Sequence, residues 1–360
     1  MEPRFAEGLT FDDVLLVPQA SGIEPREAIL ETSVARGTLS RLNGKAQLEL
    51  ILTLPFLSAA MDRVTESKMV IALGKAGGLG VLHRNCTIAQ QVQMVREAKA
   101  AKVLVAAACG PFDSARATAL DKAGADAVVI DCAHGHNLNV IDSAKKIKKK
   151  LRRAKLIFGN IATAEAARAA CTFADAVKVG VGPGSICTTR LVSGVGVPQL
   201  SAIMDVARIA AKKNIPVIAD GGIKNSGDIA KALAAGASAV MLGNLFAGCQ
   251  EAPGKIVIRQ GKKYKEYRGM GSRAVIESVS AEGRYLTKGR APVPEGVTAL
   301  IAYKGSVASI IAELASGVQV AFGYIGARNI LAFQRKAKFI RITPASVAES
   351  GPHTLSAIVG

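Results

Sequence analysis

One glycine-rich segment carries a single thiol among several hydroxyl groups. Residues 180–196 read Gly-Val-Gly-Pro-Gly-Ser-Ile-Cys-Thr-Thr-Arg-Leu-Val-Ser-Gly-Val-Gly and follow the apolar run 176–179, which is typical of a buried strand. Glycines let the backbone approach a ligand closely, and Ser185, Thr188 and Thr189 add hydroxyls beside Cys187. The segment predicts a reactive cysteine next to an anion or a planar ring; a glycine-rich turn with a buried structural cysteine is the alternative.

Polar or glycine residues also follow most of the other apolar runs. They are Ser58 with Met61-Asp62, His83-Arg84-Asn85, Asp131, Gly159-Asn160, Asp220-Gly221-Gly222 and Gly243-Asn244. Each set by itself is also explained as a helix N-cap. The last two sets stand where many barrels bind phosphate through backbone N–H groups. With the thiol they predict a nucleoside monophosphate whose ribose meets Asp220 and whose base lies near Cys187. Removing hydride from a cysteine adduct of that base needs a nicotinamide nearby.

These residues need a scaffold that brings strand ends together, and the sequence repeats a suitable unit. The predicted strands are 54–58, 80–83, 103–107, 127–131, 156–159, 177–180, 217–220 and 239–243, and the predicted helices are 66–76, 88–101, 114–123, 138–153, 164–171, 200–213 and 227–235. Strand–helix repeats with nearly continuous apolar strands predict a parallel sheet covered on its faces, most economically a closed (β/α)8 TIM barrel. A doubly wound open sheet is the alternative, but no Gly-x-Gly-x-x-Gly opens the first unit.

The pattern changes after the eighth predicted strand. Residues 252–275 predict a β-hairpin that turns at Gln260-Gly261-Lys262, and the polar stretch 273–300, called the flap below, predicts a lid or binding loop. Residues 306–315 and 327–338 are expected to form closing helices, and residues 345–360 a tail. Near the N-terminus, residues 9–18 are expected to form a short hairpin or lid strand. The chain from 1 to 360 is therefore expected to be one catalytic barrel domain.

Composition narrows the class of protein. The 360 residues include 36 glycines and are 49% hydrophobic, which suits a buried parallel sheet with many tight loops. The six cysteines show no CxxC spacing, so neither a zinc site nor a disulfide framework is indicated, and a cytoplasmic location is expected. No apolar run is expected to reach the roughly 18 residues of a membrane span, and the N-terminus does not predict a signal peptide. A soluble protein without membrane association is the expectation.

The formal net charge is +18, and the densest basic patch is residues 145–153. Apolar Ile141, Ile147 and Leu151 fall near helical spacing there, which predicts a solvated helix face; a polyanion site is the alternative. Aromatic residues make up only 4% of the chain, with no helix-turn-helix or RNP pattern, so a nucleic-acid partner is not favoured. The charge would favour a dianionic substrate.

Seven motifs together resemble the IMP dehydrogenase family. They are residues 180–190 around Cys187, Gly-Val-Gly-Val-Pro-Gln at 194–199, Val-Ile-Ala-Asp-Gly-Gly-Ile at 217–223, Tyr-Arg-Gly-Met-Gly-Ser at 267–272, Thr-Phe-Asp-Asp-Val-Leu-Leu at 10–16, Ser-Ala-Ala-Met-Asp at 58–62 and His-Arg-Asn at 83–85. The resemblance extends from about residue 8 into the tail. It implies a (β/α)8 barrel, usually a homotetramer, that converts IMP, NAD⁺ and water to XMP and NADH in guanine nucleotide biosynthesis.

The family pattern also implies roles for individual residues. Cys187 is the implied nucleophile at purine C2, Thr189 positions the hydrolytic water, and Arg284 is the implied general base on a flap that it shares with Tyr285. The implied substrate contacts are Ser185, Gly222, Gly243, Asn244 and Tyr267 at the phosphate, Asp220 at the ribose, and Met270, Gly271 and Glu295 at the hypoxanthine. Asp131, Asn160 and Gly180 are implied to face NAD⁺. The carbonyls of Gly182, Gly184 and Cys187 are implied to bind K⁺, with Glu349, Ser350 and Gly351 from a neighbouring subunit.

The sequence departs from the family pattern in three places. The family commonly inserts two regulatory CBS modules after the second strand, whereas residues 91–103 here predict one helix running straight into the next strand, so these modules are expected to be absent. Asn244 stands where a serine often binds phosphate, and Gly351 replaces a frequent histidine. The alternative activity is that of GMP reductase, the NADPH-dependent reductive deamination of GMP to IMP. The Arg284-Tyr285 pair and the long flap favour the dehydrogenase.

Overall fold

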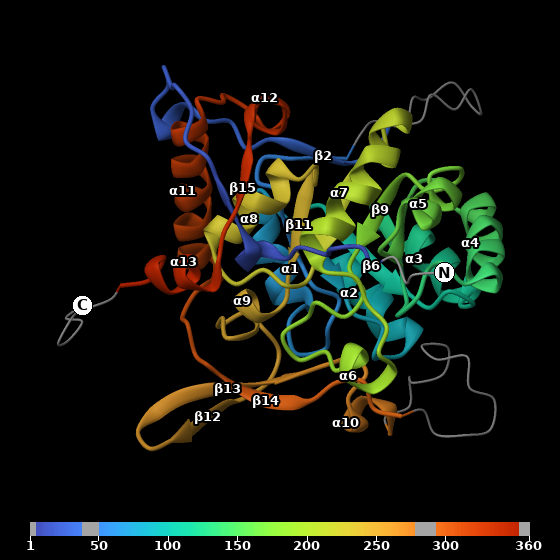
Figure 1. Cartoon of the computed structure of the whole chain (residues 1–360). Helices are drawn as coiled ribbons and strands as arrows, with labels where there is room; N and C mark the ends of the chain where they lie inside the picture. Colours follow the sequence, from blue (N-terminus) through green and yellow to red (C-terminus); the bar gives the residue numbers. More distant parts are fainter. Residues whose placement is uncertain (1–4, 38–49, 278–292, 353–360) are drawn as a thin grey trace.

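A closed barrel of eight parallel strands forms the centre of the molecule, in the order β10-β11-β4-β5-β6-β7-β8-β9 (Figure 1). The computed structural model describes residues 5–37, 50–277 and 293–352. The strands are β4 (Phe56–Ser58), β5 (Leu79–Leu82), β6 (Val105–Cys109), β7 (Ala127–Asp131), β8 (Lys155–Ile161), β9 (Ala176–Val179), β10 (Val217–Asp220) and β11 (Ala239–Leu242). The predicted (β/α)8 barrel is confirmed, and the open sheet is excluded because β11 pairs with β4.

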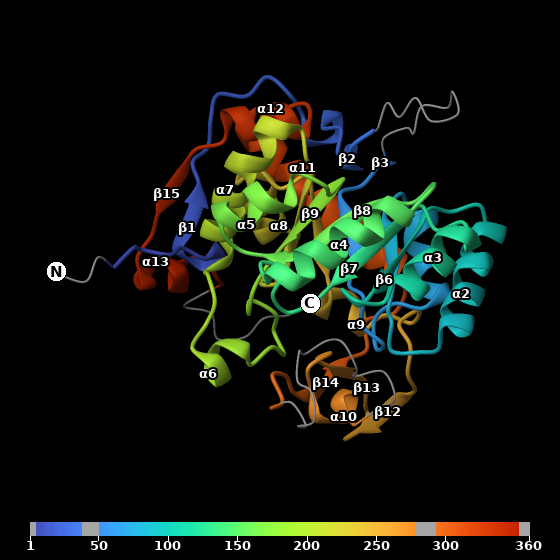
Figure 2. The ribbon, with the colours of Figure 1, turned by 90° about the vertical axis from the view of Figure 1, so that its right-hand side faces the viewer.

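The predicted helices lie between these strands and cover the outside of the barrel (Figures 1 and 2). They are α1 (Ser67–Lys75), α2 (Ile88–Ala100), α3 (Ser114–Ala123), α4 (Leu138–Lys150), α5 (Ala164–Ala170), α7 (Gln199–Ala210) and α8 (Ser226–Ala234). Their apolar faces join the outer faces of the strands in one continuous core. Side-chain oxygens of Thr87, Asn137 and Asn225 accept N–H bonds in the first turns of α2, α4 and α8, which fixes where these helices begin.

A second core fills the inside of the barrel. It contains Val129 of β7, Ala176 of β9 and Ile218 of β10, and the antiparallel pair β2 (Thr32–Ala35) and β3 (Leu50–Leu52) adds side chains to it. Because side chains alternate between the two faces of a strand, the next inward position falls at Asp131, Lys178 and Asp220 respectively. The inside of the barrel therefore changes from apolar to polar toward the carboxyl ends of the strands.

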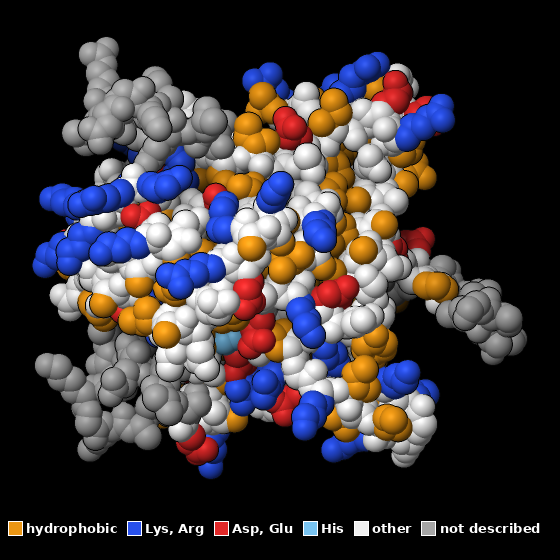
Figure 3. Space-filling view, turned by 180° about the vertical axis from the view of Figure 1, so that it is seen from behind, with side chains coloured by type: hydrophobic (Ala, Val, Ile, Leu, Met, Phe, Trp, Pro, Cys, Tyr) orange, Lys and Arg blue, Asp and Glu red, His pale blue; other side chains and the backbone are white. Residues whose placement is uncertain are grey.

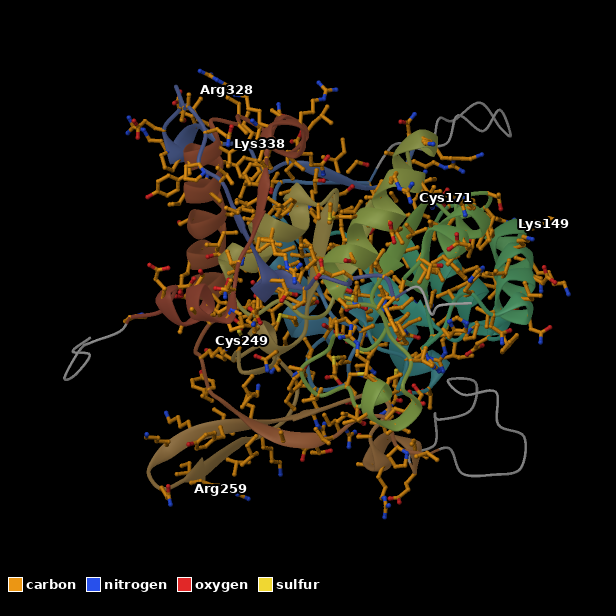
Figure 4. The ribbon with its side chains drawn as sticks, viewed as in Figure 1. Lys149, Cys171, Cys249, Arg259, Arg328 and Lys338 are labelled. Atoms are coloured by element: carbon orange, nitrogen blue, oxygen red, sulfur yellow. The ribbon has the colours of Figure 1, made fainter. Side chains whose placement is uncertain are left out.

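The C-terminal third of the chain adds a small sheet and the helix that closes the barrel. The predicted hairpin is confirmed as β12 (Ile256–Arg259) and β13 (Lys262–Arg268), with φ of 49° and 72° at the two turn residues Gln260 and Gly261. β14 (Thr298–Ala302), which was not predicted, pairs with β13. This sheet lies below the barrel in Figures 1 and 2, on the side of α6 (Thr189–Ser193), and Arg259 projects from it in Figure 4.

The flap expected at 273–300 begins with α10 (Arg273–Ile276) and ends in β14. Residues 278–292, and with them Arg284 and Tyr285, lie outside the described residues. The N-terminal segment 9–18 forms a 3-10 helix, η1 (Phe11–Asp13), and then β1 (Val14–Leu16). β1 pairs with β15 (Phe339–Arg341) near the C-terminus, so of the two alternatives for this segment the local hairpin was wrong and a short strand is present. The tail also contains α13 (Pro344–Glu349), after α12 (Ile330–Lys336).

The closing helix α11 (Val307–Ile325) is longer than the predicted 306–315. An 18-residue window of this 19-residue helix has a mean hydropathy of 1.4, so by length and composition alone α11 could cross a membrane, which corrects the expectation that no such segment exists. Val307, Ile311, Leu314 and Val318 recur on one face of α11 and are buried in the outer core. α11 therefore packs its apolar face against the outside of the barrel.

The basic stretch on α4 is an exposed helix face, as predicted. Ile141 and Ile147 are buried, whereas Lys145, Lys146 and Lys149 are exposed. Figure 3 shows lysine and arginine side chains gathered over α4, and Figure 4 shows Lys149 at the outer edge of the molecule.

Candidate active site

A cavity of about 530 Å³ lies at the carboxyl ends of the barrel strands. Its lining contains most of the residues that the sequence singled out: Asp131, Asn160, Gly180, Gly182, Gly184, Ser185, Cys187, Thr189, Asp220, Gly222, Gly243, Asn244, Tyr267, Met270, Gly271 and Glu295. A volume of this size is in the usual range for a small-molecule site. Residues spread over more than 160 positions of the chain thus meet in one cavity, as the barrel topology predicts.

The cysteine is held in a chain of polar contacts. Cys187 Sγ lies 3.1 Å from Thr189 Oγ1, which donates a hydrogen bond of 2.7 Å to Glu295 Oε2. Because the single hydroxyl hydrogen of Thr189 is directed at Glu295, the thiol is the donor in the first contact. A proton leaving the sulfur therefore has a path through Thr189 to a carboxylate.

Backbone hydrogen bonds between three segments distant in the sequence hold the contacts among Cys187, Thr189 and Glu295 in place. Thr188 N–H donates to the Glu295 carbonyl over 3.0 Å, and Glu295 N–H donates to the Gly271 carbonyl over 2.9 Å. Val297 N–H donates to the Ile186 carbonyl over 3.1 Å. The cysteine loop, the loop after β13 and the segment before β14 therefore form one interlocked unit.

Two of the residues expected at the phosphate, Tyr267 and Gly243, lie against each other in the cavity lining. Tyr267 of β13 is buried, and its hydroxyl contacts Met61 Sδ over 3.9 Å. Burial, together with the negative charge of Asp220, raises the pKa of the Tyr267 phenol to about 12, so it stays neutral and can donate. A Cβ atom at Gly243 would come within 2.8 Å of Tyr267 Oη, which shows how closely the backbone approaches this hydroxyl.

A buried lysine joins three cavity residues from different strands. Lys178 Nζ donates to Asp131 Oδ1 over 3.1 Å, to Asp220 Oδ2 over 2.6 Å and to Asn160 Oδ1. Its side chain is 2% exposed. Burial alone would lower the pKa of Lys178, but the carboxylates of Asp220 and Asp131 outweigh burial and raise it, so the ammonium is charged.

A second network supports the loop after β13 from outside the cavity. Asp62 is buried and accepts hydrogen bonds from Arg268 Nε and Nη2 and, over 2.7 Å, from Asn85 Nδ2. Burial would raise the pKa of Asp62, but the bonds from Arg268 and Asn85 hold it below its ordinary value. Asp62, His83 and Asn85 therefore stabilise the site indirectly, whereas Ala59, Ala60 and Met61 of the neighbouring motif line the cavity.

Some predicted residues are not in the cavity. Glu349, Ser350 and Gly351, in and after α13, do not line it. No group of three or more His, Cys, Asp or Glu side chains that could hold a metal ion occurs in the described ranges 5–37, 50–277 and 293–352.

Sequence reasoning missed several residues of the lining, among them Thr10, Lys224, Met241 and above all Lys178. The signal for Lys178 is present in the sequence, because it is the one charged residue in the otherwise apolar run 176–179. It stands two positions after the inward-facing Ala176, so strand alternation places it inside the barrel.

Comparison with known proteins identifies the family of the chain. Residues 8–353 match the family model described as IMP dehydrogenase / GMP reductase domain. The chain is 38% identical to an inosine-5'-monophosphate dehydrogenase of Halobacterium salinarum, covering 97% of this chain and 94% of that protein. It is also 38% identical to the Borreliella burgdorferi enzyme of the same name, over 98% of both chains, and 37% identical to that of Cryptosporidium parvum, over 99% and 97%. The uninterrupted α2 and the single matched domain fit a form without CBS modules.

Proposed function

The chain belongs to the IMP dehydrogenase / GMP reductase family, and from that premise we propose that it oxidises IMP to XMP with NAD⁺ and water through a covalent bond to Cys187. In the first half-reaction, the sulfur of Cys187 bonds to purine C2 and the hydrogen at C2 leaves as hydride. In the second, a water oxygen bonds to C2, the carbon–sulfur bond breaks and the thiol regains a proton. NAD⁺, when bound, supplies the hydride acceptor.

The contact chain from Cys187 through Thr189 to Glu295 is the observation that carries this proposal. Glu295 can receive the thiol proton through the Thr189 hydroxyl, which leaves the sulfur as the nucleophile. Once the sulfur is bonded to C2, the same hydroxyl is free to accept a hydrogen bond from a water directed at that carbon. One relay of side chains thus serves both half-reactions.

The proposed placement of IMP rests on which groups of the cavity lining suit its phosphate, its ribose and its base. Ser185, Tyr267 and the backbone of Gly222 and Gly243 offer neutral donors for the phosphate. Asp220 offers a carboxylate to the ribose hydroxyls, and Met270, Gly271 and Glu295 would border the hypoxanthine. Asn244 also lines the cavity and is assigned to the phosphate.

Three further lining residues support the position of NAD⁺. Asp131, Asn160 and Gly180 line the same cavity as Cys187, so these residues fit a nicotinamide riboside lying beside the purine. Asp131 and Asn160 provide polar atoms of the kind that ribose hydroxyls and a carboxamide require.

We further propose K⁺ as a structural cation of the cysteine loop, held by the carbonyls of Gly182, Gly184 and Cys187. Backbone oxygens in a flexible loop are hard ligands that suit a monovalent cation. Glu349, Ser350 and Gly351 would complete this site from a neighbouring subunit, consistent with a homotetramer. Rates in K⁺ that equal those in Li⁺ at matched ionic strength would remove the cation from the proposal.

Arg284 on the flap is proposed as the general base of the hydrolytic step, with Tyr285 beside it. The assignment rests on the family motif, because a free arginine has a pKa above 12 and is normally a donor. Arg284→Ala should accumulate the covalent adduct, because hydride leaves before the base acts. A variant that hydrolyses the adduct at the normal rate would remove this assignment.

The function is tested by incubating the purified protein with IMP and NAD⁺ and following NADH absorbance and XMP by chromatography. In Cys187→Ala the activity should be lost and IMP binding should be retained. The proposed activity belongs to guanine nucleotide synthesis in the cytoplasm. If NADH does not form, while GMP and NADPH release ammonia, the reductase activity replaces the dehydrogenase.

A further inference from the structure

The buried ion cluster around Lys178 has a defined geometry in which each hydrogen of the ammonium has its own acceptor. An ammonium has three hydrogens, and Lys178 directs them to Asp131, Asn160 and Asp220, on three different strands or strand ends. Its donors are therefore all engaged by protein groups. Lys178 is not available to bind a phosphate, although it lines the cavity.

The barrel wall is shaped to hold this lysine in one position. Gly159 of β8 is the neighbour of Lys178 in the sheet, and a Cβ atom at Gly159 would lie 2.7 Å from Lys178 Cβ. Only a glycine leaves room for the lysine side chain there. The ammonium thus has a fixed place and in turn fixes the groups that accept its hydrogens.

Asp220 is oriented by two donors of this cluster. Its Oδ2 accepts from both Lys178 Nζ and, over 3.0 Å, Asn160 Nδ2. Within the part of the chain that the structure describes, Oδ1 has no hydrogen-bond donor, and the side chain is 22% exposed at the cavity. One oxygen is therefore anchored and the other is presented to a ligand.

The charge of the cluster determines which ligand group it accepts. Two carboxylates and one ammonium leave a net negative charge at this wall, which repels a phosphate and attracts hydroxyl donors. We propose that Lys178 is a positioning residue that makes the site selective for ribonucleotides over 2′-deoxyribonucleotides, by aiming Asp220 Oδ1 at the ribose diol. This inference rests on the proposed function, because it takes the substrate to be a nucleoside monophosphate.

The test compares IMP with 2′-deoxy-IMP in the wild-type protein, in Lys178→Met and in Lys178→Gln. Dissociation constants are measured by calorimetry without NAD⁺, and kcat/KM by NADH formation. Wild type should prefer IMP at least about tenfold, because a site built to bond a hydroxyl rejects the analogue that lacks it. Lys178→Met should lose most of that preference by binding IMP more weakly, with 2′-deoxy-IMP little affected.

A matched control removes another buried ion pair. Lys148→Met breaks the contact with Asp175, which is 1% exposed and lies away from the cavity lining, and should keep the wild-type preference. Lys178→Gln, which retains a neutral donor, carries the test if the methionine variant does not melt cooperatively. A folded Lys178 variant with the wild-type preference for IMP overturns the inference. A wild type that binds IMP but forms no NADH instead rejects the proposed function.

Discussion

Gly243→Ala tests the close packing at the proposed phosphate end of the cavity. The added Cβ would lie 2.8 Å from Tyr267 Oη and 3.4 Å from Met61 Sδ. Gly243 has a φ of −100°, which alanine adopts without strain, so the cost is steric. Overpacking of this kind costs about 1–3 kcal/mol. If the whole cost falls on IMP binding, KM rises about 5- to 150-fold, since 1.4 kcal/mol is tenfold.

The assay combines urea unfolding with the KM for IMP. Removing the hydroxyl that the new methyl group meets should relieve the clash, so the double variant Gly243→Ala, Tyr267→Phe should be more stable than the sum of the single variants predicts. Gly22→Ala is the matched control, because a Cβ there meets nothing within 4 Å. An additive double variant, or a Gly243→Ala protein with unchanged KM and stability, would refute the packing argument.

Three further variants test other contacts. Thr189→Val removes the relay to Glu295 and should slow both the first burst of NADH in stopped flow and steady-state turnover, by about 10²–10⁴-fold; a burst at the wild-type rate would confine Thr189 to the hydrolytic half-reaction. Asp62→Asn leaves Arg268 without its buried partner and should lower the free energy of unfolding by about 3–5 kcal/mol at neutral pH. Because the pKa of Asp62 is lowered on folding, its contribution is complete above the ordinary value of 3.8 and is lost as pH falls through the folded pKa, so the two proteins should converge in acid urea titrations. Lys265→Met frees three backbone carbonyls of the turn after α9 (Asn244–Ala247), and limited proteolysis should then cut the hairpin faster than in wild type; equal cutting rates would show that this ammonium does not anchor it.

The barrel was predictable because its signals are local. Parallel strands buried on both faces are apolar throughout, and glycine or polar residues at their ends separate them from the helices. Segments such as 114–123 and 217–220 coincide with α3 and β10 for that reason. The cavity followed from topology, since the carboxyl ends of all barrel strands lie on one face.

The parts that were missed depend on contacts between distant residues. β1 and β15 have only three residues each and are stabilised by pairing with one another across almost the whole chain, so neither has a local signal. α11 continues past the predicted end at residue 315 because Gly317 packs closely on Ser226 of α8, where a Cβ would come within 2.3 Å of Ser226 Oγ. A glycine that reads locally as a helix breaker is here a close contact between helices.

The site residues also fall into those that local sequence predicts and those that depend on contacts between distant residues. The identities of Cys187, Asp220 and Glu295 followed from motif and loop composition, and the structure places all three in one cavity. The bond from Thr189 to Glu295 joins residues 106 positions apart and was not predictable from spacing. Lys178 was missed although strand alternation from Ala176 places it inside the predicted barrel; its partners Asp131, Asn160 and Asp220 come from other strands, so the cluster is not visible in local sequence.

The central claim is a covalent bond between one sulfur and the purine, and mass spectrometry of the intact protein tests it directly. Wild-type protein quenched during turnover with IMP and NAD⁺ should carry one purine monophosphate per chain, on the peptide that contains Cys187, and Cys187→Ala should carry none. An enzyme that forms NADH with Cys187 unmodified at every time point, or with the purine on another residue, would contradict the account.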